Sequence, residues 1–314
     1  MVVGGEPAKS RSVFTWSRNG VVILSFVVMG GAVGGYTCCQ PLVPPDGPPQ
    51  PDPVVDAAEP EPSTDGAGAA DQVTEPLPSC EFVGPRARGG KRRETRIVGG
   101  KPAQADAFPF AAALTTSTGF QYCGASIIGD RYALTAAHCQ AEVGDRVLVG
   151  STDLAEARHI AVVESRINPR FDSNTMDYDA AIAVLASDAG VPAVPIARGV
   201  TTLDATVIGW GATCEGCAGT KHLREVSVPL WDAATCEGVY GALTLRQVCA
   251  GLVTGGKDSC RGDSGGSLLT WTVDHWEQLG IVSWGAGCAR PNAPGVYSDL
   301  RAADLRRWVE ACSR

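Results

Sequence analysis

From Ile97 onward, the chain consists of short apolar runs that are broken by Gly, Pro, Asn and Asp. Each run has the length of a strand, and their regular spacing predicts an all-β fold built as a sandwich or as barrels. Only the tail has helical spacing, so we predict a helix over 301–312 that is capped by Ser298 or Asp299. The clearest strand candidates are 131–139, 145–150, 159–167, 179–185, 204–211, 223–230, 277–285 and 295–300.

Residues 1–37 have the composition of an export signal. A positively charged stretch precedes the apolar run 21–36, as in signal peptides. The run is diluted by glycine and is short for a membrane span, which needs about 20 residues. We therefore expect a secreted protein with a signal peptide. The alternatives are an uncleaved signal anchor or lipidation at Cys38 or Cys39, either of which would hold the protein at a membrane or cell surface.

Residues 38–96 change character within the segment. From Gln40 to Ser79 the chain is rich in proline and acidic residues and has no Lys or Arg, which predicts a disordered tether. The following stretch 86–96 is basic and contains glycine, so we expect an exposed, protease-sensitive hinge. A basic patch for anionic surfaces is the competing interpretation.

Composition agrees with export and argues against several function classes. Twelve cysteines are typical of an exported protein rather than a cytosolic one, and their spacing does not indicate a metal cluster. We expect no metal and no cofactor. The net charge is −8, and no part of the chain after residue 96 is rich in Lys and Arg, so nucleic acid is not an expected partner.

The stretch GDSGG, residues 262–266, places Ser264 among glycines. It fits the nucleophile turn of α/β-hydrolases, but that fold needs alternating strands and helices and an acid and a histidine after the serine. Here the order His138, Asp179, Ser264 is available instead. A serine hydroxyl needs an adjacent base, an imidazole can serve as that base, and a buried carboxylate can orient the imidazole. Each of these residues alone is more often structural; their conjunction carries the inference.

The motifs RIVGG, LTAAHC, YDAAIAVL, GWG, DSCRGDSGGS, SWG and PGVYSDL occur in the order found in trypsin/chymotrypsin-like serine proteases, and the chain resembles that family from Ile97 to about Trp308. The resemblance implies an all-β peptidase domain over 97–314. It implies two antiparallel six-stranded β-barrels, 97–200 and 201–300, with the active site between them. The C-terminal α-helix 301–312 completes the expected domain.

The resemblance also assigns the site. His138, Asp179 and Ser264 would be catalytic, and the N–H groups of Gly262 and Ser264 would form the oxyanion hole. Asp258 would lie at the floor of a pocket that selects Arg or Lys before the scissile bond. The remaining residues expected to bind substrate are Ser259, Ser283, Trp284, Gly285 and Gly295.

An activation switch follows from the same resemblance. Cleavage after Arg96 would free the ammonium group of Ile97, which would insert and pair with Asp263. The alternative leaves Asp263 bonded only to local backbone N–H groups. Because Arg96 fits the expected specificity, we hypothesise self-activation, in which a Ser264→Ala proenzyme stays intact while the wild type cuts itself.

Four disulfides are expected. The family pattern implies Cys123–Cys139, Cys236–Cys249 and Cys260–Cys288, and Cys214 and Cys217 would bridge each other across a tight loop. Some relatives tether the propeptide by a disulfide, so Cys80–Cys312 is conceivable, while Cys38 and Cys39 stay unassigned. Thr270 stands where another family cysteine is expected.

These expectations combine into a secreted serine endopeptidase, made as a zymogen, that cleaves proteins or peptides after Arg or Lys. We expect a monomer, with protein inhibitors as further partners. A catalytically inactive homologue that acts as a binding or regulatory module is the main alternative, and a lipase or esterase is the second.

Overall fold

The computed structural model of the protein describes Cys80 and residues 98–211, 213–214, 219–260 and 262–314. The predictions for the signal segment 1–37, for the tether and hinge apart from Cys80, and for Arg96, Ile97 and Cys217 lie outside the described residues. Within the described residues, no helix is long and apolar enough to span a membrane.

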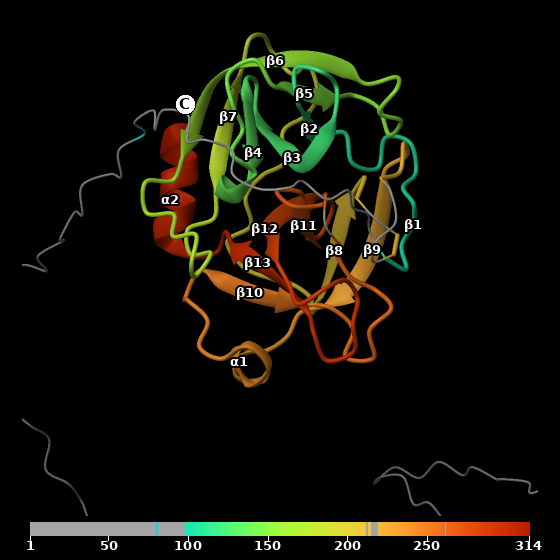
Figure 1. The fold of residues 1–314 in the computed structure, drawn as a ribbon, viewed down its shortest axis with the longest axis vertical. Coiled ribbons are helices and arrows are strands. Elements are labelled where there is room, and N and C mark those ends of the chain that lie inside the picture. The colour runs from blue at the N-terminus through green and yellow to red at the C-terminus, as the bar shows by residue number, and fades with distance from the viewer. Residues whose placement is uncertain (1–79, 81–97, 212, 215–218, 261) are drawn as a thin grey trace, which may run out of the picture. The chain divides into compact units, whose positions relative to one another are not determined.

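The first half of the described domain closes into an antiparallel barrel (Figure 1). Its core contains the fully buried side chains of Leu114, Ile127, Leu134, Ile182 and Leu185. The alternation of apolar residues along short strands therefore produces one filled barrel interior, as predicted. In barrel order the strands are β2 (Ala111–Thr115), β3 (Gln121–Gly129), β4 (Tyr132–Thr135), β7 (Ala181–Leu185), β6 (Arg158–Ile167) and β5 (Arg146–Val149).

The second half forms an antiparallel sheet that curls so that its last strand returns to its second strand. The strand order is β1 (Lys101–Pro102), β9 (Arg224–Pro229), β8 (Asp204–Gly209), β11 (Ser267–Trp271), β12 (Trp276–Trp284), β13 (Gly295–Asp299) and β10 (Gln247–Ala250). Trp231 N–H donates to Cys249 O at 2.9 Å and Gly251 N–H donates to Pro229 O at 3.0 Å, which joins β10 back to β9.

The sheet thus contains the six expected strands of the second half plus one more. The extra strand, β1, comes from the start of the segment expected for the first barrel and pairs with β9. Its backbone partners are Lys101 with Glu225 and Pro102 with Arg224. The all-β fold class is confirmed. The difference from the prediction is that β1 belongs to the sheet of the second half and not to the first barrel.

Helices occur at three places in the part of the chain that the structure describes, and only the last was predicted. The short 3-10 helix η1 (Ala137–Cys139) and the helix α1 (Ala233–Tyr240) were not expected from the sequence. In α1 only Cys236 is buried, so the helix has no apolar stripe that a periodicity argument could find. Its start is marked instead by Asp232, whose carboxylate accepts a hydrogen bond from Thr235 N–H at 2.8 Å.

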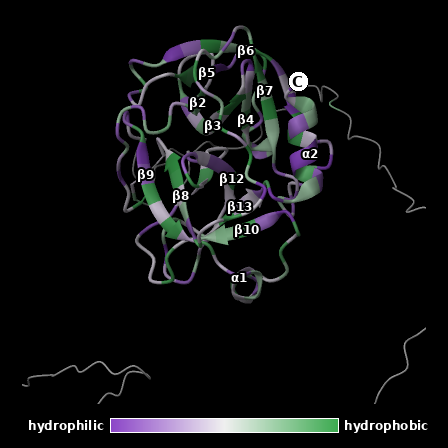
Figure 2. Ribbon diagram, turned by 180° about the vertical axis from the view of Figure 1, so that it is seen from behind, coloured by the Kyte–Doolittle hydropathy of each residue, from purple (hydrophilic) through white to green (hydrophobic). Residues whose placement is uncertain are grey.

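The C-terminal helix α2 (Ala303–Cys312) was predicted, but its expected cap was wrong. Its N-cap is Ala302, with no side-chain hydrogen bond, because the Asp299 carboxylate instead accepts from the Arg301 backbone and guanidinium. The buried side chains of α2 join the core of the first barrel, and polar and apolar residues alternate around it in Figure 2. The end of the chain therefore returns from the second half to cover the first.

Buried polar contacts hold the two halves together near the site. Ser126 Oγ on β3 donates to Gln278 Oε1 on β12 at 2.5 Å, and both residues are fully buried. Gly124 N–H on β3 donates to the carbonyl of Ser264 at 2.8 Å. Such buried bonds are costly to leave half-made, so they fix how the halves meet.

Candidate active site

His138 lies where β4 runs into η1, at the edge of the first barrel. The next residue, Cys139, is bonded to Cys123 on β3 and is buried. Gln140 then takes a left-handed conformation with φ 52° and ends the turn. The disulfide and the turn hold the His138 backbone in place while its side chain stays 24% exposed.

Asp179 is fully buried immediately before β7 and receives hydrogen bonds from both halves. Its Oδ2 lies 2.7 Å from His138 Nδ1, and its Oδ1 accepts from His138 N–H at 2.8 Å. Ser283 Oγ on β12 donates to Oδ2 at 2.5 Å, and Ser298 Oγ on β13 donates to the Asp179 carbonyl at 2.9 Å. These bonds compensate the burial of the carboxylate and orient it toward the imidazole.

The electrostatics of this pair make the imidazole a stronger base than a free histidine and stabilise the imidazolium formed when it accepts a proton. Burial lowers the pKa of His138, but the charge of Asp179 and the hydrogen bond to it outweigh burial, so the pKa is raised above its usual value. The imidazole Nδ1 therefore serves as the donor to Asp179. This leaves Nε2 as the nitrogen that can exchange a proton with a substrate or nucleophile.

Ser264 reaches the same place from the second half. Besides the bond from Gly124, the Ser264 carbonyl lies 3.6 Å from Cys139 Sγ, one residue from His138. The hydrogen bonds that His138 makes within the described residues go to Asp179. The structure therefore brings the imidazole and the carboxylate into contact and places the serine backbone beside them.

The GDSGG turn leaves two N–H groups free. Gly262 and Gly265 have φ of 86° and 80°, and a methyl group on Gly265 would collide with Thr135 Oγ1 and the Gly124 carbonyl. The N–H groups of residues 263, 265 and 266 donate to backbone carbonyls. Within the described part of the chain, those of Gly262 and Ser264 have no such partner. Two neighbouring unpaired donors are what an oxyanion requires.

Asp263 is fully buried beneath this turn. Its Oδ1 accepts from Gly211 N–H at 2.8 Å, and its Oδ2 accepts from Cys260 N–H at 3.1 Å. Burial raises the pKa of Asp263 well above its usual value, and no cation pairs with it among the described residues. The GWG motif has its explanation here, since a methyl group on Gly209 or Gly211 would overlap the Asp263 carboxylate.

A cavity of about 180 Å³ opens beside Ser264 and ends at Asp258. Asp258 is 2% exposed, and its carboxylate accepts long hydrogen bonds, each of 3.4 Å, from Ser259 Oγ, Tyr297 OH and Ala289 N–H. Burial raises the pKa of Asp258 to about 7, although these hydrogen bonds counteract it. The other lining residues are Cys260, Val282, Ser283, Trp284, Gly285, Gly287 and Gly295.

The pocket glycines differ in how tightly they are held. A methyl group on Gly295 would lie 2.7 Å from Asp258 Oδ1 and 3.1 Å from Ser259 Oγ, so glycine is needed to keep the floor open. A methyl group on Gly285 would meet its neighbours at 3.7 Å, an ordinary contact. Gly285 therefore forms wall, and a larger side chain there would take up pocket volume.

Residue 98 is anchored at the pocket floor. Val98 N–H donates to the Asp258 carbonyl at 3.2 Å, and Asp258 N–H donates back to the Val98 carbonyl at 3.4 Å. Val98 also packs against Cys260 and Cys288. The start of the described domain thus lies against the segment that carries Asp258 and Asp263.

Disulfides brace these segments. Cys123 pairs with Cys139, Cys236 with Cys249, and Cys260 with Cys288. Cys80 pairs with Cys312, which links the segment before the domain to the last turn of α2. Cys214 is disulfide-bonded, and its expected partner Cys217 lies outside the described residues.

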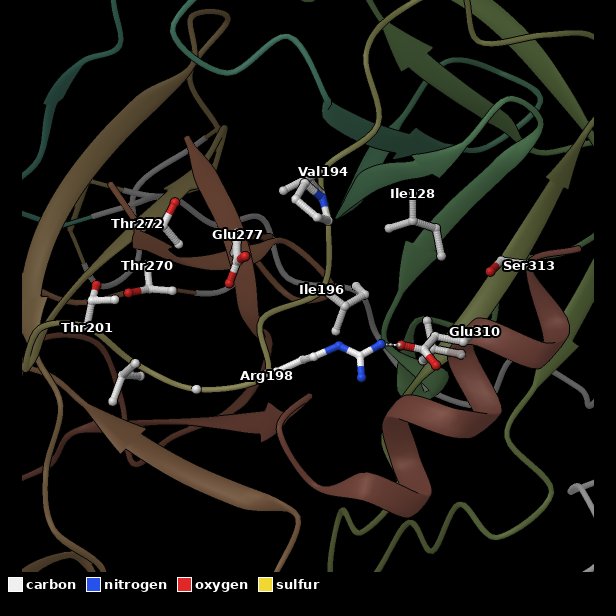
Figure 3. Close-up of a pocket in the computed structure, with 14 residues that line it drawn as sticks. Ile128, Val194, Ile196, Arg198, Thr201, Thr270, Thr272, Glu277, Glu310 and Ser313 are labelled. Carbon is white, nitrogen blue, oxygen red and sulfur yellow. Dashed lines mark hydrogen bonds and ion pairs between the residues drawn. The ribbon is translucent and has the colours of Figure 1, made fainter. Parts of the chain in front are cut away.

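A larger cavity, of about 630 Å³, lies elsewhere, between the segment 194–201, β11, β12 and α2 (Figure 3). Arg198 and Glu310 form an ion pair at 3.2 Å on its α2 side, and Glu277 projects into it from β12. Its lining contains none of the predicted site residues. The smaller pocket is lined by Asp258 and Ser264 and is therefore the candidate substrate pocket.

Sequence reasoning missed three functional contacts. Ser283 was expected only to bind substrate, yet it also bonds to Asp179, as Ser298 does. Tyr297 was not singled out, although its buried OH donates to Ser259 Oγ at 3.1 Å and reaches Asp258. All three residues lie in the SWG and PGVYSDL motifs. The motifs therefore marked these positions, but the sequence alone did not show which side chains they contact.

A closed barrel, a second sheet and a His138–Asp179 pair beside a serine turn are the fold and site of a serine protease. The sequence model of the family described as Trypsin matches residues 97–309. The chain therefore belongs to the trypsin family, and its substrates are proteins.

Curated relatives carry the same name. Trypsin of Simulium vittatum is 39% identical over 220 residues, which cover 64% of this chain and 87% of the relative. Trypsin-1 of Astacus astacus is 35% identical over 225 residues, 65% of this chain and 95% of the relative. Trypsin of Saccharopolyspora erythraea is 36% identical over 223 residues, which cover 66% of this chain and 94% of the relative.

Proposed function

We propose that residues 97–314 form an endopeptidase that cleaves after Arg and Lys, is made as a proenzyme and is exported. The observation that carries the proposal is the 2.7 Å contact between His138 Nδ1 and Asp179 Oδ2, next to a serine turn and to a pocket that ends in a buried aspartate. The contact supplies an oriented base, and the pocket supplies a counter-charge for a basic side chain.

The catalytic cycle follows from these positions. Ser264 Oγ attacks the substrate carbonyl carbon while His138 Nε2 accepts its proton, and Asp179 stabilises the resulting imidazolium. The free N–H groups of Gly262 and Ser264 donate to the carbonyl oxygen as it becomes negative. His138 then gives the proton to the leaving amine, and a water molecule activated by His138 hydrolyses the acyl-enzyme.

Specificity is assigned to the pocket floor. A guanidinium or ammonium group entering the cavity would meet Asp258, whose long hydrogen bonds leave its carboxylate undersatisfied. A charge-assisted bond in a buried slot is stronger than one to a neutral partner. Ser259 and Tyr297 add hydroxyls beside the carboxylate that can position a lysine as well as an arginine.

Activation by cleavage after Arg96 is supported by two contacts. Val98 is fixed by its paired backbone bonds to Asp258, which stands five residues before Asp263 in the sequence. Asp263 is buried without a cationic partner among the described residues. The ammonium group of a new terminus at Ile97 would supply that partner and stabilise the turn above it.

The disulfide Cys80–Cys312 gives activation a second consequence. After cleavage at Arg96, the propeptide segment that carries Cys80 would stay attached to α2. Exported proteins form such bridges readily, which supports secretion. On denaturing gel electrophoresis, the processed protein should give one band without reductant and two bands with it. Two bands without reductant would contradict a disulfide-linked propeptide.

One experiment tests the activity. The purified chain is cut after Arg96 and treated with a fluorophosphonate, which labels only a serine activated by its base. We expect labelling of Ser264 and cleavage of peptides after Arg and Lys, and no labelling of His138→Ala. An unlabelled processed protein would instead indicate an inactive binding homologue.

A further inference from the structure

The residue before Asp179 has an unusual backbone conformation. Tyr178 has φ 52°, in the left-handed region that bulky residues rarely occupy. Such a conformation is strained and persists only where the surroundings hold it. Because Asp179 follows directly, its direction toward His138 depends on this backbone.

The Tyr178 side chain contacts two guanidinium groups and one carboxylate, and Arg170 Nη1 also donates to its OH at 3.1 Å. The guanidinium carbon of Arg246 lies 4.4 Å from the ring centroid, and that of Arg170 lies 5.5 Å from it. The phenol OH donates to Asp304 Oδ2 at 2.6 Å. Cation–π contacts and a charge-assisted hydrogen bond can together offset the backbone strain at Tyr178.

Arg246 is itself fixed by two carboxylates. Its Nε and Nη2 each lie 2.9 Å from an oxygen of Asp177, and its Nη1 lies 3.5 Å from Asp304 Oδ2. The Arg246 and Asp177 side chains are only 19% and 15% exposed. A bidentate, largely buried pair fixes orientation far better than an exposed ion pair does.

Three elements meet in this cluster. Asp177 and Tyr178 precede β7 in the first barrel, Arg246 precedes β10 in the second half, and Asp304 lies in the first turn of α2. The cluster therefore sets the backbone beside Asp179, separately from the bonds that Asp179 makes itself.

We propose that Tyr178 and Arg246 are positioning residues: the guanidinium stack holds Tyr178 in its left-handed conformation and thereby aims Asp179 at His138. The proposal rests on the catalytic role assigned above to His138 and Asp179. Without the stack, residue 178 relaxes and the Asp179–His138 bond lengthens. The pocket around Asp258 is untouched, so the loss falls on kcat rather than KM.

The main test compares Arg246→Ala with a matched variant, Arg301→Ala. Arg301 also forms a partly buried two-oxygen pair, with Asp299, and its side chain makes no contact with Tyr178 or Asp179 among the described residues. We expect Arg246→Ala to lower kcat at least about tenfold with KM changed less than about twofold, since small misplacements of catalytic groups have large effects on rate. Equal kcat values in the two variants would overturn the proposal.

A second comparison identifies the strain as the cause. Asparagine tolerates the left-handed conformation, so Tyr178→Asn needs no stack to hold it. Adding Arg246→Ala to Tyr178→Asn should therefore lower kcat less than about threefold, a non-additive result. The same tenfold loss in both backgrounds would show that Arg246 acts by another route.

A spectroscopic readout separates positioning from general destabilisation. The proton shared by His138 Nδ1 and Asp179 should give a low-field NMR signal in the wild type and in Arg301→Ala, and it should weaken or shift in Arg246→Ala. Should Arg246→Ala fail to fold, Arg246→Lys keeps the charge but loses the planar fork and should show the same direction of change. If the wild type hydrolyses no peptide, the proposed function has failed; if it does and these variants match it, only this inference has.

Discussion

Three buried aspartates near the site differ in how their charge is compensated. Asp179 receives side-chain and backbone hydrogen bonds from both halves of the domain. Asp258 and Asp263 receive only long or backbone bonds, and burial raises the pKa of each. A carboxylate buried this way is costly unless a cation arrives. In the proposed function each has one: the substrate side chain at Asp258 and the Ile97 ammonium group at Asp263.

At the residue scale, Asp258 predicts a pH-dependent affinity for cationic ligands. The empty pocket should hold a proton below a pH of about 7, the pKa of Asp258, and lose it above. A cation binds the ionised form, so affinity should rise with pH and level off above about 7. Calorimetric titration of processed Ser264→Ala with benzamidine measures this without turnover.

The matched variant for that titration is Asp258→Asn. It should bind the amidine at least about tenfold more weakly at high pH and show no rise through neutrality. An affinity for the Asp258 protein that stays flat from about pH 5 to about pH 9 would contradict the assignment of Asp258 as the cation partner.

At the scale of elements, the sequence predicted the strands that stand out as short apolar runs and missed others. The missed strand β2 reads AAALT, and alanine has low β-propensity, while β3 is interrupted by Cys and Gly. Their strand character comes from barrel pairing that acts between distant segments. By contrast, the residues of the site follow family motifs and could be placed in advance, except where Tyr297 and Ser298 act across the fold on Asp258 and Asp179.

The loop after β8 gives a prediction at this scale. Gly211 donates its N–H to Asp263, and a methyl group on it would overlap the carboxylate. Gly211→Ala should therefore displace Asp263, prevent its pairing with Ile97 and lower kcat/KM of the processed protein at least about tenfold, as overpacking costs about 1–3 kcal/mol.

Gly238 in α1 is the control, because a methyl group there meets nothing within 4 Å. Gly238→Ala should leave kcat/KM unchanged and slightly stabilise the helix. Assays of both variants after cutting at Arg96 check this, and a fully active Gly211→Ala would show that the Asp263 position does not depend on this glycine.

At the scale of the whole molecule, the first strand and the last helix of the described domain each pack on the half that is distant from them in sequence. β1 adds to the second half, α2 covers the first, and Cys80 is bonded to Cys312 at the end of α2. Residues 98–102 thus link the proposed cleavage point to the half of the domain whose β10–β11 loop carries Asp258 and Asp263. Activation should consequently be visible in the stability of the whole domain as well as in its activity.

Asp263 makes that link measurable through pH. Its pKa is raised in the folded proenzyme, so between the unfolded value of about 4 and that raised value the folded state holds the extra proton. Stability should therefore fall as pH rises, by up to about 1.4 kcal/mol per pH unit.

Urea unfolding of uncut Ser264→Ala at several pH values should show this slope, and Asp263→Asn in the same background should show a smaller slope. Cutting after Arg96 should reduce it as well, because the Ile97 ammonium group then stabilises the ionised carboxylate. Identical slopes in cut and uncut protein would mean that the two groups do not pair.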